Sequence, residues 1–161
     1  MKLNVSSSEN TIVKAKKSDK KDIMRFYKNQ RYSASFIGQD QCYIVKRGDF
    51  IIASAIVSAG QGSDDCWLLH GLVTNKDQRG ENIASLLLQT IFSEQNALKQ
   101  ARYQQIVCFA DIALQPFYQK NHFISYNSSK NIAQLPLEFK ERLLGYRAKQ
   151  QSLHCFLYSA N

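Results

Sequence analysis

The stretch from Leu68 to Leu88, LLHGLVTNKDQRGENIASLLL, constrains the fold of this chain more than any other part of it. Its first residues are apolar and lead to the β-branched Thr74, which is typical of a strand. Its last residues repeat apolar side chains at helical spacing, and a polar loop with one arginine and one glycine lies between the two parts. The first turn of such a helix directs N–H groups and a positive dipole end outward, where they favour a phosphate. The stretch therefore predicts a strand–loop–helix unit suited to phosphate, although many such units bind nothing and this loop matches neither GxxxxGK[ST] nor GxGxxG.

Length and composition predict a single domain over residues 1–161. The 161 residues are 44% apolar and 11% aromatic, which is enough for one proper core and too little chain for two ordinary domains. No apolar run approaches the length of a membrane span, and Met1–Asn10 has no apolar signal-peptide core. We therefore expect a cytoplasmic protein without a membrane partner, either a monomer or a homodimer.

The formal net charge of +8 predicts an anionic partner, which is a nucleic acid, an anionic surface or a phosphate-bearing cofactor. The basic residues are scattered except for the run Lys14–Lys21, which is more typical of a solvated helix start than of a nucleic-acid arm. The four cysteines form no CxxC pair, and the three histidines have no ligand spacing with them. We expect reduced, buried thiols and no metal site.

The apolar pattern predicts an α/β (α+β) chain. The expected strands cover 11–16, 42–45, 50–58, 67–74, 105–110, 123–126 and 153–158. The expected helices are one capped by Ser18 and others over 32–36, 82–97, 112–121 and 137–147, with a polar loop over 128–134. The helix over 82–97 is long enough to be a crossover, so strands 67–74 and 105–110 are expected to pair in parallel.

Two motifs, read together with this order of elements, resemble the GNAT superfamily of N-acetyltransferases. The first is Arg79-Gly80-Glu81-Asn82-Ile83-Ala84, compared with [Q/R]-x-x-G-x-[G/A] in the family. The second is Asp111-Ile112-Ala113-Leu114-Gln115-Pro116-Phe117-Tyr118-Gln119-Lys120-Asn121-His122-Phe123, compared with N-x-x-A-x-x-[L/F]-Y-x-x-x-G-F. The resemblance covers roughly residues 11–126. It implies a mixed, twisted central sheet of about seven strands flanked by helices, and transfer of an acetyl group from acetyl-CoA to an amine.

Three of the positions at which the chain departs from the family motifs bear on the expected site. Asn82 and His122 each replace a glycine, and Asp111 replaces an asparagine. Asparagine is the next most tolerated residue at positive φ, so the loop geometry is expected to survive at Asn82. At the end of the motif helix, Asn121 is expected to take the left-handed position.

The resemblance implies acetyl-CoA as co-substrate, with no metal. The loop would offer N–H groups and the Arg79 guanidinium to the pyrophosphate, and the strand edge would pair with the pantetheine amides. The alternative for Arg79 is a solvated loop arginine. The implied cofactor-binding residues are Leu72, Val73, Thr74, Arg79, Gly80, Glu81, Asn82, Ile83, Ala84, Ser85 and Asp111.

Tyr118 and His70 are the implied catalytic residues. Tyr118 stands where the family carries a tyrosine, which would protonate the departing thiolate; the alternative is a core aromatic. Side chains alternate between the two faces of a strand, so His70 lies on the same face as Thr74 and is expected to face the acceptor amine as a base. The alternative is a buried, hydrogen-bonded histidine.

The acceptor is a small-molecule or peptide amine that the sequence does not identify further. Two rival functions stay open: a non-catalytic acyl-CoA-binding or regulatory protein on the same fold, and a basic nucleic-acid-binding module.

Overall fold

A computed structural model describes residues 9–33, 40–60, 63–97 and 104–159 of the chain. Its contacts divide the chain into two compact units. Unit 1 comprises Met1–Ile56 and Gly71–Ile91, and unit 2 comprises Val57–His70 and Phe92–Asn161. The division passes through β3 (Phe50–Gly60) and β4 (Ser63–Thr74), so each of these long strands contributes to both units.

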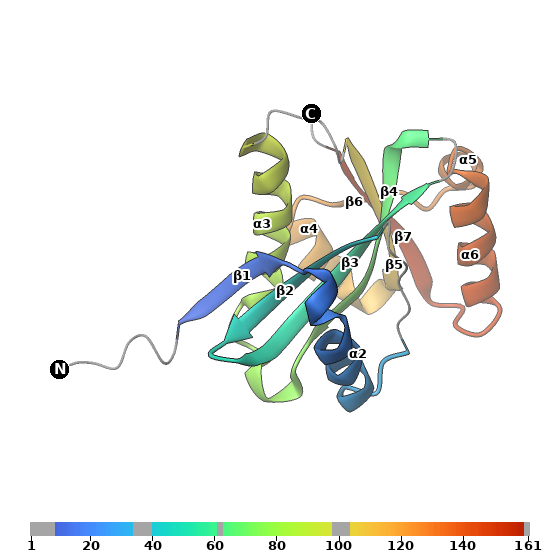
Figure 1. Cartoon of the computed structure of the whole chain (residues 1–161). Coiled ribbons are helices and arrows are strands. Elements are labelled where there is room, and N and C mark those ends of the chain that lie inside the picture. The colour runs from blue at the N-terminus through green and yellow to red at the C-terminus, as the bar shows by residue number, and fades with distance from the viewer. Residues whose placement is uncertain (1–8, 34–39, 61–62, 98–103, 160–161) are drawn as a thin grey trace. The chain divides into compact units, whose positions relative to one another are not determined.

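The strands form a seven-stranded sheet in the order β1-β2-β3-β4-β5-β7-β6 (Figure 1). β5 (Gln105–Asp111) runs parallel to β4 and antiparallel to β7 (Leu153–Ser159). The sheet is therefore mixed, which confirms the predicted α/β class and the predicted parallel pair. None of the helices that the structure describes combines the length and the apolar character needed to cross a membrane.

Unit 1 begins with β1 (Asn10–Lys14), which pairs antiparallel with β2 (Gln41–Arg47). The helix α2 (Lys20–Asn29) buries three side chains at helical spacing, Ile23, Phe26 and Tyr27, against apolar residues of β2 and β3. A short 3-10 helix, Lys17–Asp19, precedes α2, and Asp19 is the N-cap residue. The prediction of Ser18 as N-cap was wrong, because the 3-10 turn moves the start of α2 beyond it.

Tyr27 fixes α2 to the strands of unit 1. Its hydroxyl donates to the carbonyl oxygen of Gly71 at 2.7 Å and lies 2.9 Å from Oγ of Ser54, whose hydroxyl can donate in return. Burial raises the pKa of Tyr27 far above its ordinary value, so the phenol stays protonated and keeps its donor.

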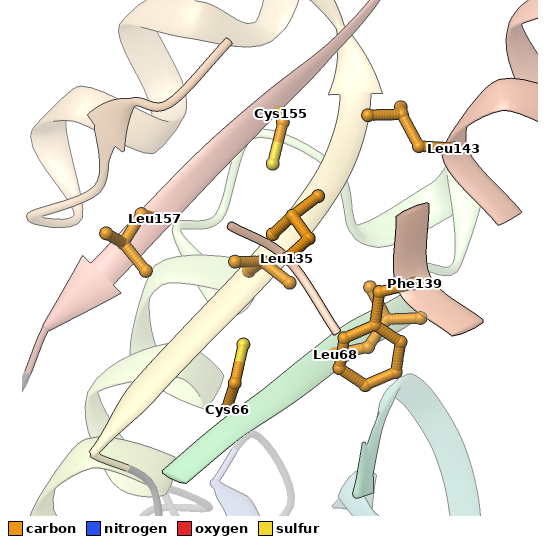
Figure 2. Packing of buried hydrophobic residues seen from close by; sticks show 8 residues of the cluster. Cys66, Leu68, Leu135, Phe139, Leu143, Cys155 and Leu157 are labelled. Carbon is orange, nitrogen blue, oxygen red and sulfur yellow. The ribbon is translucent and has the colours of Figure 1, made fainter. Parts of the chain in front are cut away.

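Unit 2 holds α4 (Gln115–Lys120), β6 (Ile124–Ser125), α5 (Ser129–Ala133) and α6 (Leu137–Arg147) together with β5 and β7. Phe139 and Leu143 of α6 pack on side chains from β4, β5 and β7 (Figure 2). The members of this cluster are Cys66, Leu68, Val107, Leu135, Phe139, Leu143, Cys155 and Leu157. All four cysteines of the chain are unpaired and buried, as predicted.

The main difference from the predicted elements is α5, where a polar loop was expected. Its N-cap is Ser128, whose hydroxyl accepts from the N–H of Asn131 at 3.1 Å, while the Asn131 side chain accepts from the N–H of Ser128. This reciprocal cap forms a helix from a sequence with almost no apolar face. Tyr32 and Ser33 are not helical, and the rest of the helix expected over 32–36 lies outside the described residues.

Candidate active site

The predicted site residues fall in both units. Leu72–Thr74 and the loop Arg79–Ser85 belong to unit 1, whereas His70, Asp111 and Tyr118 belong to unit 2. The unit 1 residues form nearly one continuous segment that runs from the end of β4 to the start of α3 (Ile83–Ala97).

Two residues with positive φ shape the loop before α3. Gly80 has φ +87° and Asn82 has φ +65°. The substitution of asparagine for the motif glycine therefore preserves a left-handed residue, as expected. The N–H of Leu86 makes the first helical bond, to the carbonyl oxygen of Asn82 at 3.2 Å. The first turn of a helix directs N–H groups and a positive dipole end outward, which is the arrangement that favours an anion.

The base of the loop is held by side chains that the motif does not include. Asn75 caps a 3-10 helix, Lys76–Gln78, by accepting from the N–H of Asp77 at 2.9 Å. Its own N–H donates to the carbonyl oxygen of Ile52 at 2.8 Å. Gln30 accepts from the N–H of Lys76 at 3.1 Å. These bonds position the loop while the Arg79 side chain stays exposed, with a long contact of 3.4 Å from Nε to the carbonyl oxygen of Thr74.

Glu81 has an ion-pair partner within unit 1. A guanidinium nitrogen of Arg47, at the end of β2, lies 2.7 Å from Oε1 of Glu81, and Nε of Arg47 donates to Asn10 at 3.0 Å. This pair offsets the one negative charge of the segment Arg79–Ser85. Sequence reasoning missed Arg47 because it lies far from the motif in the chain.

Gly71 interrupts the alternation of side chains along β4. It has φ +63° inside the strand, and a Cβ at this position would lie 3.0 Å from the Tyr27 hydroxyl oxygen. Counting by twos from Thr74 to His70 passes through this residue, so the predicted orientation of His70 loses its basis. The ladder with β5 covers Cys66–Leu69, and β4 continues beyond it through Leu72–Thr74.

His70 is half-buried and hydrogen-bonded. Its Nε2 lies 2.8 Å from Oγ of Ser58, a buried residue of β3 that is 7% exposed. The contact is compatible with a histidine that has only a structural role. It is also compatible with a base, because it fixes the orientation of the ring. Both residues belong to unit 2.

Tyr118 lies in a cluster of aromatic rings in unit 2. It is 6% exposed, its ring stacks on Phe156 with centroids 5.2 Å apart, and Phe123 meets it edge-on at 5.3 Å. Its side chain also hydrogen-bonds the buried Cys108 thiol. Burial raises the pKa of Cys108, the neighbouring Cys155 adds to this, and the bond from Tyr118 acts in the opposite direction. Tyr118 is thus packed as a core aromatic and also presents a polar group.

The helix α4 ends with His122 in the left-handed position, at φ +72°. The N–H of His122 donates to the carbonyl oxygen of Gln119 at 3.1 Å, and the N–H of Phe123 donates to that of Tyr118 at 2.9 Å. These two bonds define a Schellman motif. The prediction that Asn121 takes the left-handed position was wrong, since its φ is −98° and its side chain instead donates to the carbonyl oxygen of Phe117 at 2.9 Å.

Asp111 is tied to the segment that precedes β7. Its carboxylate accepts from the Ser152 hydroxyl at 2.5 Å, from the N–H of Ala113 at 2.9 Å and from the Gln150 amide at 3.2 Å. The bond from Ser152, followed by those from Ala113 and Gln150, lowers the pKa of Asp111. Asp111 is therefore ionised at neutral pH, and it has the capping role that an asparagine would have there.

Unit 1 also contains a pocket of about 620 Å³ that the sequence did not indicate. Its lining comes from α2, from the end of β2 and the start of β3 with the turn between them, and from the segment Asn75–Gln78. These segments are far apart in the sequence, so no motif links them. Among the described residues, no group of three or more His, Cys, Asp or Glu side chains is arranged to hold a metal ion.

The sequence was compared with protein families and with curated proteins. Residues 38–125, more than half of the chain, match the family profile described as Acetyltransferase (GNAT) domain. Comparison with the curated proteins finds no significant match.

The fold was compared with solved structures. It is similar to N-acetylglutamate synthase from Neisseria gonorrhoeae, complexed with coenzyme A and N-acetyl-glutamate, with a TM-score of 0.67 and 13% identity over 96% of this chain. The match spans only 36% of that synthase chain. A GNAT-family acetyltransferase from Staphylococcus aureus Mu50 gives a TM-score of 0.64 and 14% identity, over 95% of this chain and 100% of the other. The ribosomal-protein-S18-alanine N-acetyltransferase from Escherichia coli gives a TM-score of 0.65 and 10% identity, over 95% of each chain.

Proposed function

Because this chain belongs to the GNAT acetyltransferase family, we propose that it transfers the acetyl group of acetyl-CoA to the primary amine of an acceptor. The observation that carries the proposal is the loop before α3, where left-handed residues at Gly80 and Asn82 lead into the first turn of a helix. Such a turn presents N–H groups and a positive dipole end to an anion. The pyrophosphate of acetyl-CoA is the anion we assign to it.

The unit 1 residues would hold the cofactor. Arg79 is exposed and would make a charge-assisted contact with the pyrophosphate, with the N–H groups of Gly80–Ser85 around it. The pairing of Glu81 with Arg47 supports this assignment, because it reduces the repulsion between that carboxylate and an anionic cofactor. Leu72, Val73 and Thr74 continue β4 beyond its ladder with β5, and we assign their backbone groups to the pantetheine amides.

Acetyl transfer needs a neutral amine, and an alkyl ammonium group has a pKa of about 10. We assign the removal of its proton to His70, which the Ser58 contact orients. The neutral nitrogen attacks the thioester carbonyl and a new C–N bond forms. The nitrogen then gives its second proton to solvent, from which Tyr118 is later reprotonated, and the C–S bond breaks to release the CoA thiolate. We assign protonation of that thiolate to Tyr118, since a phenol keeps its proton at neutral pH. No covalent intermediate on the protein is part of this scheme.

The acceptor is proposed only as a small-molecule or peptide amine. The names of the structural neighbours include products and acceptors as different as N-acetyl-glutamate and a ribosomal-protein alanine. We further propose that the chain acts as a single domain in the cytoplasm.

Thermal unfolding with and without acetyl-CoA tests the proposal. A ligand at a hundred times its Kd adds about 2.7 kcal/mol of stability, which raises the Tm measurably. Arg79→Ala should need a higher acetyl-CoA concentration for the same shift, whereas Arg142→Ala, which removes an exposed arginine of α6 in unit 2, should behave like wild type. A wild-type protein whose Tm does not respond to acetyl-CoA would refute the proposal, and an unchanged response in Arg79→Ala would refute the role of Arg79.

A further inference from the structure

The pocket in unit 1 is lined by both apolar and polar residues. Phe26 of α2 and Ile52 of β3 are buried apolar residues that line it, and its volume is about 620 Å³. This is within the range of about 300 to 1,000 Å³ that small-molecule sites occupy. The buried apolar residues favour an apolar group of the ligand, and the polar residues determine which other groups the ligand carries.

Charges of both signs line the pocket from two elements. Asp22 and Arg25 come from α2, Arg47 is the last residue of β2, and Asp49 lies in the turn that follows it. Asp22 and Arg25 approach each other only to 3.8 Å and are both largely exposed, so their mutual attraction is weak. The pocket thus offers two guanidinium groups and two carboxylates without a net charge of its own.

Gln78 adds a buried acceptor that has no partner among the described residues. Gln78 is one of the residues that line the pocket. Its Oε1 is shielded from solvent, yet it makes no hydrogen bond with the described residues. A buried polar atom left in this state destabilises the folded chain. If the Gln78 amide turns toward the pocket, a ligand that brings an N–H donor would satisfy this oxygen, so the pocket favours an amine over a second acceptor.

We propose that this pocket binds a small ligand that carries both a free amine and a free carboxylate, such as an amino acid or a short peptide. The carboxylate would meet Arg25 and Arg47, whose guanidinium groups suit it in geometry and charge. The amine would meet Gln78 Oε1 and the Asp49 carboxylate, and an apolar side chain would cover Phe26 and Ile52.

The ligand would also act on the loop before α3. Arg47 lines the pocket and holds Glu81 of the loop at 2.7 Å, while Gln78 directly precedes Arg79. A carboxylate bound to Arg47 competes with Glu81 for the same guanidinium. Ligand and cofactor would therefore change each other's affinity by one common factor. This second part rests on the proposed function; the binding itself does not.

Direct binding is tested by calorimetry on the full chain without acetyl-CoA, with the dipeptide alanyl-leucine at millimolar concentration as probe. We expect binding, and at least about tenfold weaker affinity for the N-acetylated and C-amidated forms, equivalent to about 1.4 kcal/mol for each lost group. Gln78→Met keeps the side-chain length without the amide, and Arg25→Gln removes one guanidinium. Each should weaken binding about tenfold, whereas Arg142→Gln should not.

The proposal is overturned if wild type does not bind the dipeptide, or if the blocked forms bind as well as the free one. It is also overturned if Gln78→Met and Arg25→Gln, with unchanged circular dichroism, both bind like Arg142→Gln. The coupling is tested by the Kd for CoA with and without saturating dipeptide. An unchanged CoA affinity would refute the coupling, and a protein that binds dipeptide but no CoA would refute the proposed function while leaving the pocket intact.

Discussion

At the residue scale, single side chains serve both the packing and the proposed chemistry. Tyr118 is buried among Phe117, Phe123 and Phe156, yet its side chain also hydrogen-bonds Cys108. His70 is likewise tied to Ser58. A buried tyrosine normally needs a hydrogen-bond partner, so packing alone would explain the bond. Removing a hydroxyl while keeping the ring separates the two roles.

Tyr118→Phe is expected to lower kcat by roughly ten- to a thousand-fold and to leave the affinity for acetyl-CoA nearly unchanged, because only the proton donor is lost. Steady-state kinetics with an acceptor amine measure this. Tyr158→Phe is the matched control, since its ring stacks on Phe92 in the same unit and it has no proposed catalytic role. An unaltered kcat in a folded Tyr118→Phe protein would mean that water or another group protonates the thiolate.

At the element scale, the ends of helices explain where sequence reasoning succeeded and where it failed. The apolar spacing predicted α6, Leu137–Arg147, to the residue, and the parallel pairing of β4 with β5 followed from the crossover length. α5 was not predicted because its segment is polar and has almost no apolar periodicity. Its stability comes from the reciprocal cap between Ser128 and Asn131. Asn82 was predicted correctly because its conformation is local.

Other parts of the candidate site could not be predicted, because they depend on tertiary contacts. The pairing of Arg47 with Glu81 joins residues 34 positions apart, and the partners of Asp111 at Gln150 and Ser152 are about 40 positions away. The orientation of His70 was inferred by alternation along β4, and that count passes through Gly71, which has a positive φ and where the close approach of Tyr27 requires a glycine.

The end of α4 gives a prediction at this scale. His122 adopts φ +72° and is exposed, so its side chain strains the backbone without covering any core. The left-handed conformation costs a non-glycine residue about 1 to 2 kcal/mol, part of which glycine loses again through the entropy of the unfolded chain. His122→Gly should therefore stabilise the protein by roughly 0.5 to 1 kcal/mol, measured by urea unfolding. Asn121→Gly, one position earlier at φ −98°, should instead destabilise it.

At the scale of the whole molecule, a polar network in unit 2 makes the stability depend on pH. Nδ1 of His154 lies 3.0 Å from the amide nitrogen of Asn127, a donor, so Nδ1 accepts and Nε2 carries the proton toward Oγ of Ser125 at 2.8 Å. The amide cannot turn round, because its oxygen accepts from Arg147 and from the N–H of Cys155. A second proton on His154 would therefore face a donor, with the Arg147 charge nearby.

The free energy of unfolding is expected to fall as the pH drops below the ordinary histidine pKa of 6.5. Burial, followed by the charge of Arg147, lowers the pKa of His154 in the folded chain. Between the two pKa values the unfolded chain binds the proton and the folded chain does not, so acid favours unfolding. The stabilisation that depends on a neutral His154 is complete above pH 6.5 and is lost progressively below it.

The lowered pKa of Asp111 acts in the same direction, but only near and below its ordinary value of 3.8, so the two pH windows are separate. Urea unfolding at a series of pH values from about 7.5 to 5 measures the effect. His154→Gln should flatten the slope in this window, and an equally steep slope in that variant would assign the dependence to other groups.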